Sequence, residues 1–409
     1  MKIHMIERYA VGKEAYVICS DQIELSVTRQ GGQMAPVLFY RKDEKPVSPY
    51  FISPWQYGGE EPGHPSQKPL RGDFFCMPCG LSSQHREEGY TLHGETSGKT
   101  WDMHSYRQRE DFVELVLHMN TTVRKASVKK SICLKKGQNV VYISHRITGD
   151  IGNISLGHHA MLRLQEEQDS LLLSTSPIRF GYTLPVHSAG YFNNGVYSSL
   201  KAGQRFTELC KVPSIWQDKP SIDCSSHPVT TGFTDMLQLY NAKGREPGWV
   251  TAYYPQENYL WFALKNTEQL PSTVLWMQNK GSHPPPYCGK VRCLGIEDMC
   301  AAIGDDNNAA IRKELDREKV LYEHRITMDY PLTVNYIQGI QKVEKNFGRV
   351  KDILFRDNSI RIVSESGKGT EVSVDWNYIT TGYLKPPEVR AIDFMNGEGD
   401  ANGKIYEYI

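Results

Sequence analysis

Three stretches that lie far apart in the sequence carry side chains able to move protons on a small polar molecule. Residues 70–101 read LRGDFFCMPCG, a polar connector and TLHGETSGKTW; residues 155–164 read SLGHHAMLRL; residues 291–300 read VRCLGIEDMC. Together they contain an arginine, several histidines and a carboxylate, which suit acid–base chemistry. Because the stretches are distant in sequence, only the fold can bring them together.

The two adjacent histidines can be separated by the period of a strand. If residues 155–164 form a strand, His158 and His159 point to opposite faces of the sheet. Leu156, Ala160, Leu162 and Leu164 share the face of His158, whereas Gly157, Met161 and Arg163 share the face of His159. The first face is typical of a core and the second of a solvent-lined cleft. We therefore expect His159 to take part in chemistry and His158 to make a buried structural hydrogen bond, an assignment that a β-bulge would reverse.

Glu297 is the carboxylate best suited to act as a base. It lies in LGIEDM among apolar residues, so we expect it to be partly desolvated. Desolvation raises the pKa of a carboxyl group and makes it a stronger base near neutral pH. A salt bridge with Arg292 is the structural alternative, and Asp298 is the alternative residue for the same role.

His93 and Arg71 are the remaining polar candidates in residues 70–101. His93 precedes Gly94 in LHG, and Arg71 precedes Gly72 in RGD. A single histidine or arginine in a β-protein is more often structural, paired or solvated than part of a site. Their convergence with the other groups in glycine-rich surroundings favours a ligand site.

The nine cysteines predict neither a metal site nor a disulfide. A zinc site could be assembled from Cys76, Cys79, His283, Cys288 and Cys293. The spacing of the second cysteine pair is irregular, however, and Pro78 interrupts the first. The odd number of cysteines and a charged N-terminus favour reduced thiols. We predict no metal and no cofactor.

Composition excludes several classes of partner. Lys and Arg together number 47, as do Asp and Glu, so the formal net charge is zero. This balance argues against a general nucleic-acid or anionic-membrane binder. MKIHMIERYAVGKE carries charges where a signal peptide needs an apolar core, and no window approaches the roughly 20 apolar residues of a membrane helix. We expect a cytoplasmic protein that binds neither nucleic acid nor membranes; the sequence does not set its oligomeric state.

Strands must position these groups, because alternation of apolar and polar residues dominates the chain. Strand-like runs occur at residues 111–119, 123–133, 139–147, 236–240, 249–254, 259–264 and 273–278. Gly, Pro, Asn and Asp separate them at short intervals, which predicts an antiparallel all-β fold. One helix is expected within residues 305–320. Residues 1–345 should form the main domain, and residues 346–409 a β-rich extension packed on it.

The chain resembles the galactose mutarotase-like superfamily, which includes the aldose 1-epimerases. The matching pieces are RGD at Arg71, LHG…W from Leu92 to Trp101, HHAMLRL from His158, GFTDMLQL from Gly232 and LWMQNK…LGIED from Leu275 to Asp298. Their order agrees over roughly residues 5–345. The resemblance implies one large antiparallel β-sandwich, the galactose mutarotase-like supersandwich, with a sugar site on an open concave sheet face.

The resemblance also implies roles. Glu297 matches the general base that takes the proton from the anomeric hydroxyl, His159 the general acid at the ring oxygen, and His93 a further contact to the ring oxygen or a hydroxyl. Candidate substrate-binding residues are Arg71, Trp101, His158, Asp235 and Trp276. No metal or redox cofactor is required, and the implied partner is a small-molecule carbohydrate.

Three functions remain open from the sequence. The first is a mutarotase-type isomerase, the second a sugar-binding or sensing protein that kept the site without turnover, and the third a lyase or hydrolase on the same fold. A lyase would need an additional Tyr or Lys base. A hydrolase would need a second carboxylate facing Glu297, for which Asp235 and Glu95 are candidates.

Overall fold

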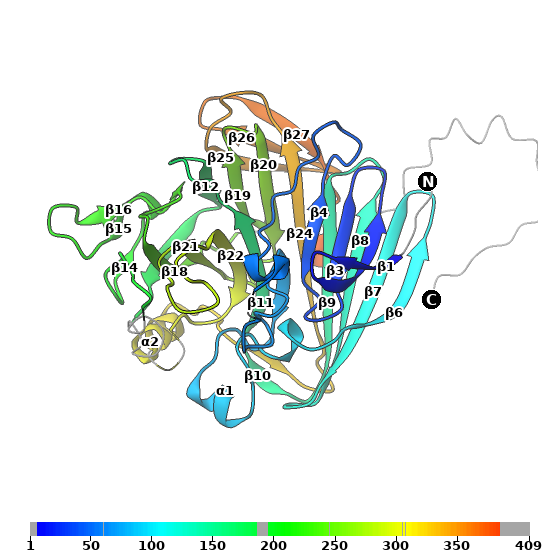
Figure 1. Ribbon diagram of the computed structural model, residues 1–409, viewed down its shortest axis with the longest axis horizontal. Coiled ribbons are helices and arrows are strands. Elements are labelled where there is room, and N and C mark those ends of the chain that lie inside the picture. The colour runs from blue at the N-terminus through cyan, green and yellow to red at the C-terminus, as the bar shows by residue number, and fades with distance from the viewer. Residues whose placement is uncertain are drawn as a thin grey trace, which may run out of the picture.

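Two large antiparallel sheets face each other and form a β-sandwich (Figure 1). The computed structural model describes residues 6–384 except residues 60, 186–194, 245, 305 and 307. The eleven-stranded sheet has the order β1 (Ile6–Ala10), β2 (Lys13–Cys19), β3 (Glu24–Thr28), β4 (Met34–Leu38), β5 (Asp73–Cys76), β11 (Leu156–Arg163), β22 (Arg292–Cys300), β21 (Ser272–Asn279), β18 (Phe233–Asn241), β13 (Ile178–Thr183) and β14 (Arg205–Phe206).

The second large sheet has nine strands. Their order is β17 (Ser226–His227), β12 (Leu171–Thr175), β19 (Gly248–Tyr254), β20 (Tyr259–Lys265), β24 (Leu332–Lys342), β9 (Val140–Gly149), β8 (Ala126–Lys135), β7 (Phe112–Thr121) and β6 (Asp102–Gln108). Two small ladders pair β10 (Gly152–Ile154) with β23 (His324–Ile326), and β15 (Val212–Pro213) with β16 (Ser221–Ile222). The predicted antiparallel all-β class is confirmed.

The main core lies between the two large sheets. β7 illustrates its origin, because Val113, Leu115, Leu117 and Met119 alternate with more exposed residues and all four are buried. A side chain every second residue lies on one face of a strand, so this alternation places a continuous apolar surface against the other sheet. Truncating one of these leucines to alanine typically costs about 2–5 kcal/mol.

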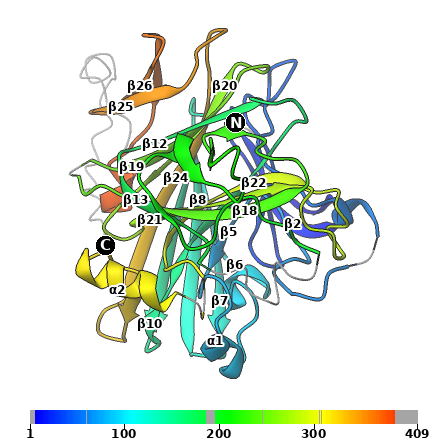
Figure 2. The ribbon, with the colours of Figure 1, turned by 90° about the vertical axis from the view of Figure 1, so that its left-hand side faces the viewer.

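A small C-terminal unit covers part of the outer face of the nine-stranded sheet. It consists of β25 (Val350–Arg356), β26 (Ser359–Ser364), β27 (Gly369–Ser373) and the short helix α3 (Tyr378–Thr381). Ile353, Ile360 and Ile362 of this unit share one apolar cluster with Phe262 and Leu264 of β20. Figure 2 shows the unit beside β12, β19 and β20. β20 is therefore buried on both faces, which explains its uninterrupted apolar run from Tyr259 to Leu264.

The helices are few and peripheral. The helix expected within residues 305–320 is α2 (Ala309–Arg317), which packs through Ile311 and Leu315. α1 (Ser83–Glu87) and the 3₁₀ turns η1 (Pro54–Tyr57), η2 (Glu95–Ser97) and η3 (Leu209–Lys211) complete the set. Among the described helices none is long and apolar enough to cross a membrane.

All nine cysteines are free thiols, and residues 6–384, outside the gaps given above, contain no cluster of His, Cys, Asp and Glu arranged to hold a metal. Tyr406 and Tyr408, which the sequence assigns to the extension, lie outside the described residues.

Candidate active site

The centre of the site is a contact between His159 on β11 and Glu297 on β22. These strands are neighbours, and their ladder pairs Gly157 with Met299 and Ala160 with Ile296, which places His159 across from Glu297. His159 Nε2 lies 3.3 Å from Glu297 Oε1. The two residues are only 3% and 5% exposed, so the contact is sheltered from bulk water.

His93 joins this pair through aromatic packing. The ring of His159 stacks on Phe74 of β5, with centroids 4.5 Å apart and an angle of 21° between the planes. His93 approaches His159 edge-on at 5.2 Å and Phe74 edge-on at 5.7 Å. The backbone turns at His93 and Gly94, both at positive φ. A Cβ on Gly94 would lie 2.0 Å from the carbonyl oxygen of Met77, so only glycine fits there.

Burial moves the pKa values of the carboxyl and the imidazoles in opposite directions. Removal from water raises the pKa of Glu297 to about 8, because it disfavours the charged carboxylate. The same desolvation lowers the pKa of His93 to about 4, with a smaller contribution from the charge of His64, and holds the pKa of His159 well below its usual value. Near neutral pH both imidazoles are therefore neutral, and Glu297 changes its ionisation near pH 8.

Several buried polar atoms at the site have no hydrogen-bond partner among the described residues. They are His93 Nδ1, His159 Nδ1 and Trp276 Nε1. Trp276 lies on β21 next to β22 and meets His159 edge-on at 6.2 Å. Gly295, opposite Trp276, lets the indole pack closely on β22, since a Cβ there would lie 3.0 Å from Trp276 Cβ. Buried polar groups are nearly always paired, so these atoms are suited to a polar ligand.

Apolar side chains surround the pair, and two loops cover it. The same face of the sheet carries an apolar cluster that includes Phe51, Leu70, Phe74, Cys76, Met161, Val274, Trp276, Cys293 and Met299. Tyr287, in the loop after β21, meets Trp276 at 6.2 Å and Trp55 at 5.4 Å. Gln67 links these loops by accepting a bond from the Trp55 indole and donating one to the Tyr287 hydroxyl. The expectation of a solvent-lined face around His159 is wrong, because this cover and the apolar floor enclose the ring.

His158 lies on the opposite face of β11, as its strand period predicts. Its Nδ1 is 2.9 Å from Asp73 Oδ2, and its ring stacks on Tyr336 with centroids 4.1 Å apart. Leu156, Ala160 and Leu162 belong to the main core on the same side. The expected buried structural hydrogen bond is confirmed, and the geometry places His158, which the resemblance offers as a substrate-binding candidate, on the opposite face of the sheet from Glu297.

Arg71 is not brought into the site. It is 0% exposed, and its guanidinium donates to the backbone oxygens of Ala10, Val11 and Pro69 and to Gln56 Oε1. These bonds anchor the N-terminal strands to the stretch before β5. The expectation that Arg71 holds sugar hydroxyls is corrected by this geometry, because its donors are directed at the protein itself.

Asp235 and Trp101 also lie elsewhere. Asp235 pairs with Met277 in the β18–β21 ladder, so its side chain is on the opposite face of the sheet from Trp276. Its carboxylate accepts bonds from the backbone N–H groups of Ser199 and Leu200 and from two serine hydroxyls. Trp101 belongs to the main core and donates its indole N–H to Thr96 O. Both residues make structural contacts in this geometry and are not brought together with Glu297.

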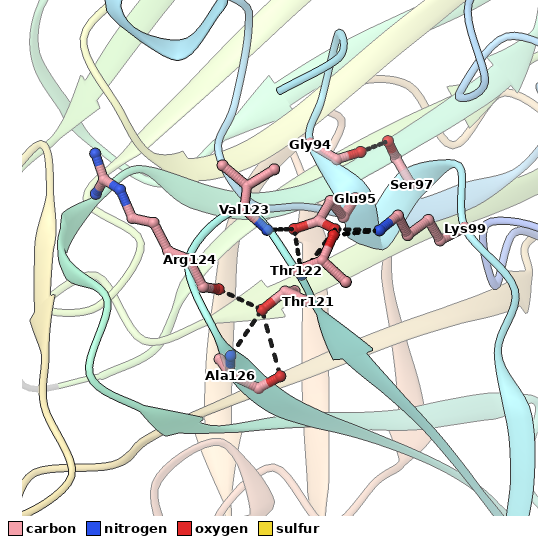
Figure 3. Close-up of polar contacts among 9 residues, drawn as sticks. All are labelled: Gly94, Glu95, Ser97, Lys99, Thr121, Thr122, Val123, Arg124 and Ala126. Carbon is pink, nitrogen blue, oxygen red and sulfur yellow. Dashed lines mark hydrogen bonds and ion pairs between the residues drawn. The ribbon is translucent and has the colours of Figure 1, made fainter. Parts of the chain in front are cut away.

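Glu95 anchors the loop that carries His93 (Figure 3). Its carboxylate accepts bonds from the backbone N–H groups of Thr122 and Val123, from the Thr122 hydroxyl and from Lys99. Burial alone would raise its pKa, but these donors outweigh burial and lower it. Glu95 is therefore tied to the turn between β7 and β8 and does not face Glu297.

Sequence reasoning missed four residues that shape the site, namely Trp55, Gln67, Phe74 and Tyr287. The strand period gives a signal for Phe74, because it places Phe74 on the same face of β5 as Cys76, and both residues belong to the apolar cluster around Glu297. The other three lie in proline-rich loops, residues 53–69 and 282–289, whose path over the sheet no local pattern specifies.

Comparison with solved structures identifies the fold. A galactose mutarotase-like protein from Clostridium acetobutylicum is 13% identical with a TM-score of 0.57, and the match covers 83% of this chain and 99% of that protein. A galactose mutarotase-like protein from Lactobacillus casei is 11% identical with a TM-score of 0.51, covering 80% of this chain and 100% of that protein. No protein-family model matches the sequence, and no curated protein matches it either. The chain has the galactose mutarotase-like β-sandwich fold, as the resemblance of its motifs predicts.

Proposed function

We propose that this protein interconverts the anomers of a free sugar, as an aldose 1-epimerase does. The observation that carries the proposal is the buried 3.3 Å contact between His159 Nε2 and Glu297 Oε1. A carboxyl group whose pKa is raised to about 8 can take up and release a proton near neutral pH. The fold of the solved relatives and the unpartnered polar atoms beside the pair support a small polar ligand.

Ring opening moves one proton from the anomeric hydroxyl to the ring oxygen while the bond between the anomeric carbon and the ring oxygen breaks. In the proposed cycle ionised Glu297 takes the hydroxyl proton. Neutral His159 gives the proton on Nδ1 to the ring oxygen while Glu297 passes a proton to His159 Nε2 across their contact, so that no imidazolate anion forms. The aldehyde carbon rotates, and the ring closes on its other face by the reverse steps.

The depressed imidazole pKa values suit this relay. An imidazole that is hard to protonate exchanges one N–H for the other without being trapped as a cation. Neutral His93 supplies a further hydrogen bond to the ring oxygen or a hydroxyl. The indole N–H of Trp276 is a donor for another hydroxyl. Each acid–base group typically contributes about 10²–10⁴-fold to the rate.

The alternatives receive less support from the geometry. A glycoside hydrolase needs a second carboxyl facing the first. The two candidates for that carboxyl, Asp235 and Glu95, are engaged by backbone N–H groups away from Glu297. A sensing protein would bind a sugar through the same contacts without turnover, so a measurement of anomer exchange is needed to distinguish it from an isomerase.

Nuclear magnetic resonance exchange spectroscopy tests the proposal. A panel of neutral aldoses, sugar phosphates and sugar acids is mixed with the protein, and the rate of anomer exchange is measured. Methyl glycosides serve as controls, because they can bind but their rings cannot open. We expect at least one free sugar to exchange faster in the presence of the protein. Binding of sugars without acceleration of any of them would contradict the isomerase and favour the sensing protein.

A further inference from the structure

We propose that Tyr336 is a positioning residue for His159 and Glu297. It acts from the core side of the sheet, where it contacts the residue next to each of them in the sequence. This inference rests on the function proposed above. Tyr336 lies on β24 of the nine-stranded sheet, on the far side of the sandwich core from the site. It reaches across the core and contacts the neighbours of both pair residues, His158 and Asp298.

The first contact fixes the strand that carries Glu297. The hydroxyl of Tyr336 donates to Asp298 Oδ2 at 2.6 Å. The other carboxylate oxygen of Asp298 accepts bonds from Lys265 Nζ and Thr273 Oγ1, both at 2.6 Å. Because successive residues of a strand point to opposite faces, anchoring Asp298 in the core fixes where Glu297 stands on the site face.

The second contact fixes the strand that carries His159. The ring of Tyr336 stacks on His158 at 4.1 Å with an angle of 17° between the planes. His158 is itself bonded to Asp73 of β5 at 2.9 Å. The residue directly before His159 is thus packed against the same tyrosine that holds the residue directly after Glu297.

The two residues that bind Asp298 from the nine-stranded sheet, Lys265 and Tyr336, are neighbours on that sheet. Lys265 on β20 pairs with Tyr336 on β24 in their ladder, so both side chains point into the core beside each other. Lys265, Tyr336 and Asp298 are at most 1% exposed. Leaving any of these buried polar groups without its partner would be costly, so the hydrogen bonds that link the two sheets have a well-defined geometry. They cross the core directly behind the 3.3 Å contact.

A misplacement of about 1 Å in a reacting group can reduce a rate about 100-fold. The Tyr336→Phe variant keeps the ring on His158 and removes the hydroxyl from Asp298. We expect kcat for anomer exchange to fall roughly 10–100-fold with KM nearly unchanged. Loosening of β22 should also admit water to Glu297 and move its pKa from about 8 towards its usual value of 4.5.

Tyr240→Phe is the matched control. Tyr240 is equally buried and also bonds through its hydroxyl, to Gln238 Oε1 at 2.8 Å, but it packs beside α2 in a different cluster. The control should lose comparable stability while its kcat and the pKa of Glu297 stay unchanged. This comparison separates positioning from a general loss of stability.

The experiment measures kcat, KM, stability and the Glu297 pKa, the last by carbon-13 resonance of labelled glutamate, in the wild type, Tyr336→Phe and Tyr240→Phe. Cys76 and Cys293 face Glu297, but burial raises both thiol pKa values, so they stay neutral through the titration. A fall in the pKa of Glu297 in Tyr336→Phe alone supports the inference, even if no sugar turns over. An unchanged pKa and unchanged kcat in Tyr336→Phe would overturn it. Absence of turnover in the wild type would instead contradict the proposed function.

Discussion

His159 Nε2 and Glu297 Oε1 lie 3.3 Å apart on neighbouring strands, among apolar side chains that exclude most of the water. In water a carboxyl and an imidazole at neutral pH would be a carboxylate and a partly charged base. Here burial favours the neutral form of each group, so that below about pH 8 protonated Glu297 faces a neutral imidazole. The ionisation of Glu297 is the basis of the predictions that follow.

The activity should depend on the ionisation of Glu297. Because the proposed base is active only as a carboxylate, kcat/KM should rise with pH and level off above about pH 8. Lys130 also titrates near this value, since burial lowers its pKa to about 8. A Lys130→Met variant that keeps the rise assigns it to Glu297. A decrease of kcat/KM through pH 8 would show that the protonated carboxyl is the active form.

The stability should depend on the same group, with a defined sign. The pKa of Glu297 is about 8 in the folded protein and 4.5, the usual value, in the unfolded chain. The folded protein therefore binds this proton more tightly than the unfolded chain does. Its contribution to the free energy of unfolding is complete below pH 4.5 and is lost as the pH rises through 8, at up to about 1.4 kcal/mol per pH unit. Urea unfolding between pH 5 and pH 8 should show a smaller decline in Glu297→Gln than in the wild type. Equal declines would contradict the raised pKa.

The two histidines should respond differently to truncation. His159→Ala should lower the anomer-exchange rate by about 10²–10⁴-fold. His158→Ala should lower the free energy of unfolding by roughly 1–3 kcal/mol, because Asp73 would lose its buried partner. Exchange rates and urea unfolding distinguish the two. An inactive but fully stable His158→Ala, beside an active His159→Ala, would reverse the assignment.

The strand period of β11 explains why this distinction was accessible from the sequence. Side chains alternate with a period of two, and the apolar residues Leu156, Ala160 and Leu162 mark the core face without further information. The alternating runs elsewhere predict the β class for the same reason. The motifs around Glu297 and His93 likewise identify strand and turn positions that the fold brings together.

Arg71, Trp101 and Asp235 could not be assigned in this way. The carbonyl of Ala10, which Arg71 binds, and the amide of Ser199, which Asp235 binds, come from segments tens of residues away. Whether a buried charge faces a ligand or the protein depends on these distant backbone groups. The packing of Trp55 and Tyr287 over the site could not be predicted from the sequence either, since it depends on the path of two irregular loops.

Removal of residues 346–409 should destabilise the remainder. Trp249, Phe262 and Leu264 of the nine-stranded sheet are buried in the cluster shared with β25–β27 and would be exposed. Full burial of one such side chain contributes roughly 1.5–3 kcal/mol. The shortened chain should therefore unfold at lower urea concentration or aggregate. A soluble product as stable as the full chain would show that the extension is an independent unit.

The exchange rate in Glu297→Gln tests the central claim most directly. The amide keeps the shape of the side chain and can still accept a hydrogen bond, but it cannot take up the proton. Glu166→Gln is the control, because Glu166 is an exposed carboxylate paired with Arg292 and Lys280. With a sugar that the wild type turns over, we predict that Glu297→Gln binds the sugar but exchanges its anomers at least 100-fold more slowly, whereas Glu166→Gln matches the wild type. Unchanged exchange in Glu297→Gln would remove the carboxylate from the mechanism.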